Sequence, residues 1–137
     1  MIVIDASSLA KYIIKEENWE KIGIFIKERK PLYSIDYIVK EVGNALWKHC
    51  KLKEAIDEAK AIKLYQALLR LIDTGVIILE PEVSYVGTAL RIALEHEITL
   101  YDSLYIAQAQ KHGELLTSDR RQAEVANKLG IKVYLVQ

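Results

Sequence analysis

Short apolar runs alternate along the chain with longer stretches whose apolar residues recur at helical spacing. The apolar runs, which predict strands, cover residues 2–4, 32–35, 76–79, 115–117 and 131–136. The helical patterns cover residues 9–14, 19–27, 36–49, 54–72, 83–95, 102–111 and 120–129. Strands that alternate with helices predict βαβ units, and therefore an α/β fold with a parallel sheet covered on both faces.

Three glycines mark boundaries between these elements. Gly75, Gly113 and Gly130 each stand where a helical pattern ends and a short apolar strand follows, as a glycine C-cap would. No linker, repeat or low-complexity segment interrupts the alternation. We therefore expect one domain over residues 1–137.

Two apolar patterns predict which elements are buried. Ile2, Val3 and Ile4 follow one another without a polar residue, which predicts a central strand buried on both faces. The helix at 102–111 is apolar nearly all round, so it should be buried. The helix at 54–72 has an unusually wide apolar face, part of which a second copy of the protein could cover.

Composition narrows the class of protein. The chain is 51% apolar and 28% charged, which is typical of a globular protein. No apolar run approaches the ~20 residues that span a bilayer, and no signal peptide precedes the first strand, so we expect no membrane partner. The single cysteine, Cys50, permits no internal disulfide, and a cytoplasmic location follows as an expectation.

The charge balance decides little. Nineteen basic and nineteen acidic residues give a net charge of zero, which argues mildly against a nucleic-acid partner. That argument weakens if several acids hold metal ions, because the remaining surface is then basic.

Four acids stand out by position. Asp5 ends the first strand, and Asp119 follows the fourth through Ser118. In a doubly wound sheet with the first strand central, these two acids face each other across the crevice where the winding reverses. Asp102 opens the most buried helix, and Glu41 lies beside the core stripe of its own helix, on a polar stripe with Asn44 and Lys48.

Clustered carboxylates raise one another's pKa values, and a divalent cation relieves their repulsion. Mg²⁺ and Mn²⁺ prefer oxygen ligands and assist displacement at phosphodiesters. The alternative is structural: Asp5, Asp102 and Asp119 each precede a helix and are placed to cap it. Glu41 alone would be an ordinary solvated residue, Ser7 and Ser118 would be caps, and Asn44 a tolerated polar residue.

The same residues carry a family resemblance. Residues 2–7 (IVIDAS), 39–47 (VKEVGNALW), 100–107 (LYDSLYIA) and 115–119 (LLTSD) together resemble the signature of PIN domains. The similarity is greatest to the VapC-type ribonucleases of toxin–antitoxin pairs, and it covers essentially the whole chain. Ser103 is a mild departure, since alanine is more usual there.

The resemblance implies a three-layer α/β/α domain with a five-stranded parallel sheet in the order 3-2-1-4-5. It implies cleavage of RNA by an endonuclease that uses Mg²⁺ or Mn²⁺ and leaves 5′-phosphate and 3′-hydroxyl ends. It also implies a homodimer and a small antitoxin partner whose tail enters the pocket. By matching positions, Asp5, Glu41 and Asp102 fall on the metal-binding acids and Asp119 on the fourth, while Ser7 and Ser118 fall on hydroxyl positions and Asn44 on a supporting one.

Other functions share this fold class. A receiver domain needs an acid pair after the first strand, an aspartate after the third and a lysine after the fifth. This chain has a lone acid after the first strand, its third strand ends with Leu79-Glu80-Pro81, and Lys132 comes before the last strand. A haloacid-dehalogenase-type phosphatase needs an acid at the position of Ser7. The alternatives that survive are an RNA-processing nuclease and a catalytically silent RNA-binding subunit with the same fold.

Five basic residues near the expected pocket could steer an RNA backbone in any of these roles, although each fits an ordinary solvated surface as well. They are Lys11, Lys48, Lys51, Arg120 and Arg121.

Overall fold

A computed structural model describes all residues 1–137, with a five-stranded parallel sheet at its centre. The strands are β1 (Ile2–Ile4), β2 (Leu32–Ile35), β3 (Ile77–Glu80), β4 (Glu114–Thr117) and β5 (Lys132–Leu135). They are ordered β3-β2-β1-β4-β5, and every neighbouring pair is parallel. The predicted fold class and strand order are therefore confirmed.

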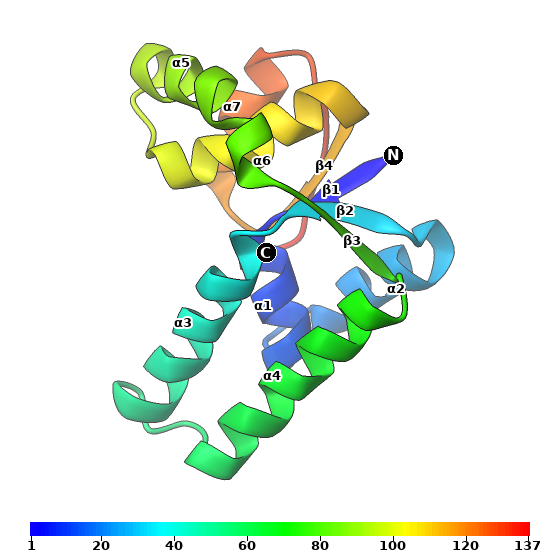
Figure 1. Ribbon diagram of the computed structural model, residues 1–137, viewed down its shortest axis with the longest axis vertical. Helices are drawn as coiled ribbons and strands as arrows, with labels where there is room; N and C mark the ends of the chain where they lie inside the picture. Colours follow the sequence, from blue (N-terminus) through cyan, green and yellow to red (C-terminus); the bar gives the residue numbers. More distant parts are fainter.

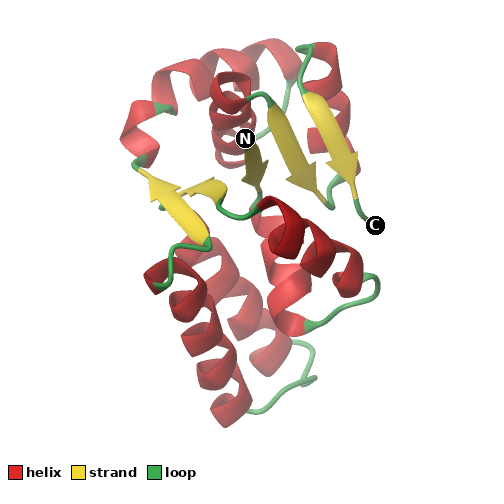
Figure 2. Cartoon of the chain, turned by 90° about the vertical axis from the view of Figure 1, so that its right-hand side faces the viewer, coloured by secondary structure: helices red, strands yellow, loops and turns green.

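Helices cover both faces of the sheet (Figures 1 and 2). One face carries α1 (Ala6–Ile14), α2 (Trp19–Arg29), α3 (Ile38–Lys51) and α4 (Glu58–Asp73). The other carries α5 (Val86–His96), α6 (Leu100–His112) and α7 (Arg120–Lys128). The long helices α3 and α4 extend well beyond the sheet as a pair (Figure 1). None of the helices is long and apolar enough to cross a bilayer.

Several helix starts differ from the prediction because capping side chains set them. The first helix begins at Ala6, because Asp5 accepts a hydrogen bond from the backbone of Ser8 and caps it. The fourth begins at Glu58 behind the cap Asp57. The pattern at 83–95 divides into a short 3₁₀ helix, η1 (Glu82–Ser84), and α5.

Asp102 does not cap its helix, so that part of the structural alternative is wrong. The helix α6 begins two residues earlier, at Leu100, and the side chain of Thr99 accepts a hydrogen bond from the backbone N–H of Asp102. Asp102 therefore lies in the first turn of α6, and its carboxylate is free for other contacts. Asp5 and Asp119 do cap helices, as that alternative expected.

The core forms where the pattern placed it. The three residues of β1 are no more than 1% exposed, and every residue from Ser103 to Ala109 in α6 is buried. The buried hydroxyl of Ser34 donates to the carbonyl of Ile4 at 2.8 Å and ties β2 to the end of β1. The carboxyl end of β1 is thus fixed from both neighbouring strands, because the backbone N–H of Asp5 also bonds to Leu116 of β4.

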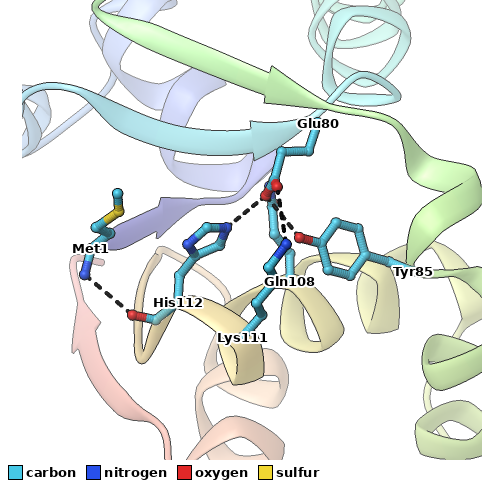
Figure 3. Close-up of polar contacts among 6 residues, drawn as sticks. All are labelled: Met1, Glu80, Tyr85, Gln108, Lys111 and His112. Atoms are coloured by element: carbon cyan, nitrogen blue, oxygen red, sulfur yellow. Dashed lines mark hydrogen bonds and ion pairs between the residues drawn. The ribbon is translucent and has the colours of Figure 1, made fainter.

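Glu80 joins the edge strand β3 to the C-terminal end of α6, the end away from Asp102 (Figure 3). Its Oε1 accepts hydrogen bonds from Tyr85 at 2.8 Å, from Gln108 at 2.9 Å and from His112 at 2.6 Å. Lys111 lies 3.6 Å from the second oxygen. The cluster anchors the helix that carries Asp102 at its other end.

Candidate active site

Asp5 is wholly buried where β1 ends. Its Oδ1 accepts hydrogen bonds from the hydroxyl of Ser7 at 2.7 Å and from the backbone N–H of Ser8 at 3.0 Å. Its Oδ2 accepts one from the hydroxyl of Thr117 at 2.5 Å. A carboxylate this deep needs such donors, because no water surrounds it.

The ends of β1 and β4 are linked by hydroxyl groups. Ser7 Oγ accepts a hydrogen bond from the backbone N–H of Ser118 at 2.9 Å, and the hydroxyls of Ser8 and Ser118 are 2.9 Å apart. Thr117 Oγ1 also accepts from the backbone N–H of Asp119 at 3.0 Å. Asp5 and Asp119 are therefore held by one network across the two central strands.

Glu41 extends from α3 toward this edge of the sheet. Its Oε1 accepts a hydrogen bond from the buried Tyr105 of α6 at 2.8 Å. Because Tyr105 lies one turn after Asp102, the same helix positions both acids. The helical stripe predicted for Glu41, Asn44 and Lys48 is observed, since all three line one cavity.

Asp102 and Asp119 share a neighbour in Gln122 of α7. The amide Nε2 of Gln122 donates to Asp102 Oδ1 at 3.2 Å, and the backbone N–H of Gln122 donates to Asp119 Oδ1 at 3.0 Å. The Oε1 of Gln122 is buried without a hydrogen-bond partner. The amide nitrogen of Gln122 faces the Asp102 carboxylate because an amide oxygen in the same place would be repelled by it.

A cavity of about 390 Å³ opens between α1, α3, α6 and α7 at the carboxyl ends of β1 and β4. Its lining comprises Ala6, Ser7, Ala10, Tyr37, Glu41, Asn44, Ala45, Lys48, Tyr101, Asp102, Asp119 and Gln122. Asp5 lies just behind the cavity wall, between β1 and the lining residue Ala6.

Other predicted site residues lie outside the cavity. Ser118 contacts it only through Ser7, and Lys11 bonds the carbonyl of Glu17. Arg120 bonds Gln137 and Arg121 bonds the carbonyl of His96. Lys51 pairs with Glu58 in a separate groove. Of the basic residues, only Lys48 lines the acidic cavity.

Burial and mutual repulsion raise the pKa values of these acids. Burial raises the pKa of Asp5 to about 6, against the lowering effect of its hydrogen bonds. Burial raises the pKa of Glu41 to about 7, and the charges of Asp102 and Asp5 add to it. Burial and the charge of Asp119 also raise the pKa of Asp102. The acids therefore repel one another in the absence of a cation.

The donor set fits a hard divalent cation. The four acids supply only oxygen atoms, and none forms an ion pair with a lysine, arginine or histidine within 4.0 Å. No three acidic, histidine or cysteine side chains converge closely enough to hold an ion as they stand. Carboxylate rotation and retained waters would have to complete the coordination, which is how Mg²⁺ is commonly held.

Several residues of this site escaped the sequence analysis. Thr117 and Tyr105 looked like strand and core residues, yet they hold Asp5 and Glu41. One signal for Gln122 was present in the sequence. It stands three positions after the capping acid Asp119, where a glutamine side chain can fold back toward the N-terminus of the helix. Tyr37 and Tyr101 had no signal beyond their nearness to Glu41 and Asp102.

Comparisons with known proteins agree with this geometry. A family model described as "PIN domain" matches residues 2–128. The chain is 33% identical over 124 residues to a protein named Ribonuclease VapC3 of Pyrobaculum aerophilum, covering 90% of this chain and 92% of that one. It is 29% identical over 131 residues to Exonuclease VapC9 of the same organism, covering 96% of this chain and 89% of that one.

Solved structures show the same fold. The crystal structure of PAE2754 from Pyrobaculum aerophilum superposes with a TM-score of 0.69 at 28% identity, covering 97% of this chain and 92% of that one. FitAcB from Neisseria gonorrhoeae superposes with a TM-score of 0.63 at 18% identity, covering 98% of this chain and 96% of that one. At that low identity the second similarity concerns the fold alone.

Proposed function

The chain belongs to the PIN-domain family, and from this premise we propose that it is an endoribonuclease that depends on Mg²⁺ or Mn²⁺. One observation supports this most: three carboxylates line one cavity where the sheet winding reverses, Asp5 lies directly behind its wall, and none of the four has a cationic partner. Open α/β sheets bind ligands at that point. The similarity to a protein named as a ribonuclease supports RNA as the substrate.

Each acid has a role in this proposal. Asp5, Glu41 and Asp102 would bind the cation, and Asp119 would contribute through water. A bound cation would polarise a water nucleophile and offset charge on the scissile phosphodiester. Asp5 and Glu41, whose pKa values are raised, would release their protons as it binds.

The remaining residues of the site orient these acids. Thr117 and Ser7 fix the Asp5 carboxylate, Tyr105 fixes that of Glu41, and Gln122 fixes that of Asp102. Fixed donors of this kind tune metal ligands and hold them in a productive geometry. Lys48, the one basic residue in the lining, would attract the RNA backbone.

We also propose that the protein is the toxin of a VapBC-type toxin–antitoxin pair, that it acts in the cytoplasm, and that it forms a homodimer. Similarity to VapC proteins supports the pairing with a small antitoxin. An apolar groove of about 430 Å³ between α3 and α4, which includes the exposed Trp47, supports a protein partner on that side. A PIN-fold RNA-processing nuclease or a silent subunit remains the competing function.

The test incubates the purified protein with a mixed pool of linear and circular RNA and either Mg²⁺ or Mn²⁺. Asp5→Asn and EDTA samples serve as controls, because the asparagine removes a charge at little steric cost. We expect cleavage of both RNA forms that needs the metal and Asp5. Cutting of linear RNA alone would indicate an exonuclease, the activity that one relative's name states.

The other outcomes separate the competing functions. Equal cleavage by the wild type and Asp5→Asn would overturn the site. A folded protein that binds Mn²⁺ but cuts no RNA would favour the silent subunit. Finding a short reading frame for a small partner beside the gene would favour the toxin over the processing enzyme.

A further inference from the structure

Two tyrosines are stacked at the mouth of the acidic cavity. The rings of Tyr37 and Tyr101 have centroids 5.2 Å apart and planes inclined by 20°. Both side chains line the cavity that Glu41, Asp102 and Asp119 also line. Tyr37 precedes Glu41 by one helical turn, and Tyr101 directly precedes Asp102. Each ring is therefore placed next to one of the proposed metal-binding acids.

Tyr101 is open to solvent, while Tyr37 is half-buried and packs against the core. The side chain of Tyr101 is 55% exposed, whereas Leu104 and Ile106 of the same helix are buried. Neither hydroxyl forms a hydrogen bond within the protein, so burial of a polar group does not explain the arrangement. Stacking leaves one face of the outer ring without a partner, and an exposed aromatic face beside a polar cavity is suited to ligand binding.

Positive charge lies beside the pair. The ammonium group of Lys40 is 5.7 Å from the centre of the Tyr37 ring. Lys48, further along the same helix α3, lines the cavity. Proteins that bind single-stranded nucleic acid combine cations for the backbone with aromatic rings for the bases. The bases of a duplex are already stacked on each other and are not available to such a ring.

From this juxtaposition we propose that Tyr37 and Tyr101 form a stacking platform for one unpaired RNA base next to the scissile phosphate. The proposal rests on the proposed nuclease function and narrows its substrate to single-stranded RNA. Tyr101 supplies the exposed face, and Tyr37 supports it from behind. The platform places the neighbouring phosphate against the acids.

A binding experiment tests the platform without requiring cleavage. The probe is a short single-stranded RNA of randomised sequence that carries 2-aminopurine, whose fluorescence is quenched when the base stacks on a ring. EDTA prevents cleavage during the titration. We expect quenching by the wild type and by Tyr101→Phe, which keeps the ring. Tyr101→Ala should weaken binding about 5- to 150-fold, the range that corresponds to one stacked base.

A duplex probe and a surface variant serve as controls. The duplex should show no quenching, and Leu94→Ala, which truncates an even more exposed apolar residue on α5, should bind as the wild type does. If the pair only braced α3 against α6, Tyr101→Ala would lower the thermal midpoint and leave quenching per bound RNA unchanged. That result overturns the platform, as does the absence of quenching by the wild type.

The two proposals fail separately. Metal-dependent cleavage without quenching would leave the nuclease in place and remove the platform, and would favour a protein partner as the ligand of these rings. Quenching without cleavage would support the platform on a silent RNA-binding subunit.

Discussion

At the scale of single residues, Asp5 shows that capping and site chemistry are compatible. One oxygen of its carboxylate caps α1, while the other bonds to Thr117 of β4. The sequence could place Asp5 at a strand end, but it could not choose between the two roles. The structure shows the cap, and the cap is compatible with the proposed metal-binding role, because a helix N-terminus stabilises the same negative charge that a cation would.

The raised pKa values predict how stability depends on pH in the metal-free protein. Folded Asp5 and Glu41 have pKa values of about 6 and about 7, above their ordinary values of 3.8 and 4.5. Between those limits the folded state holds more protons than the unfolded chain, so stability falls as pH rises. We expect the urea midpoint to fall from pH 4 to 7, and to fall less in an Asp5→Asn, Glu41→Gln double variant.

Parallel curves for the wild type and the double variant would contradict this expectation. Titrations in EDTA avoid the opposing effect of bound metal. The pKa of Asp102 is raised as well, so the stability of the double variant should still fall somewhat as pH rises.

Gln122 predicts an effect on metal affinity without a change in any ligand. Gln122→Leu removes the donor that holds Asp102, and we expect Mn²⁺ affinity to fall about 10- to 100-fold. Isothermal titration calorimetry measures the affinity directly. Gln108→Leu is the matched control, because Gln108 is also buried with an unpaired Oε1 but bonds to Glu80. Equal losses in the two variants would show a general packing defect.

At the scale of elements, the sequence pattern predicted the type and the burial of helices and strands, but it did not predict where several helices begin. The unbroken apolar character of β1 and α6 correctly predicted that both are buried. The helix α6 begins at Leu100, two residues before the start that the apolar pattern predicted. The capping hydroxyl of Thr99 sets this start, and a capping residue is not part of an apolar pattern. Residues 83–95 likewise divide at Tyr85, which ends η1 and precedes α5, and apolar spacing does not mark that break.

The attachment of β3 to α6 predicts loss of stability in acid. Burial raises the pKa of Glu80, but hydrogen bonds from Gln108, His112 and Tyr85 outweigh it and lower the value to about 2. The charge therefore stabilises the fold above the ordinary value of 4.5, and this contribution is lost as pH falls toward 2. Glu80→Gln should lose less stability than the wild type over that range.

A second variant measures the attachment itself. Glu80→Ala removes the acceptor of all three hydrogen bonds at once, and we expect a loss of about 2–3 kcal/mol at neutral pH in urea unfolding. Mn²⁺ affinity should change little, since the cluster is at the far end of α6. A large drop in affinity would instead show that α6 must be anchored for Asp102 to bind.

At the scale of the whole molecule, the site gathers side chains from both helical layers and both central strands. The strand–helix alternation predicted the sheet edge at which they meet. The positions of the four acids along the chain made them candidates, and the family resemblance implied that they bind metal. Net charge predicted nothing, because the balance of nineteen and nineteen hides an unpaired acidic cluster. Contacts such as Tyr105 with Glu41 join residues 64 positions apart, and no local pattern encodes them.

Because the acids come from four different elements, cation binding should stabilise the fold as a whole. At a concentration one hundred times the dissociation constant, Mn²⁺ should add about 2.7 kcal/mol to the free energy of unfolding. Thermal unfolding with and without Mn²⁺ measures this, and Asp5→Asn should show a much smaller gain. An equal gain in that variant would place the ion elsewhere.

The pairing of β1 with β4 also sets the order of events when the protein is made. β1 leaves the ribosome before its partner β4, and the hydroxyl of Thr117 follows Asp5 by more than a hundred residues. A nascent chain that already contains Asp5, Glu41 and Asp102 still has no strand to seat Asp5 and no Asp119. If the chain cleaves RNA, that activity is therefore withheld during translation until β4, Thr117 and Asp119 have been added.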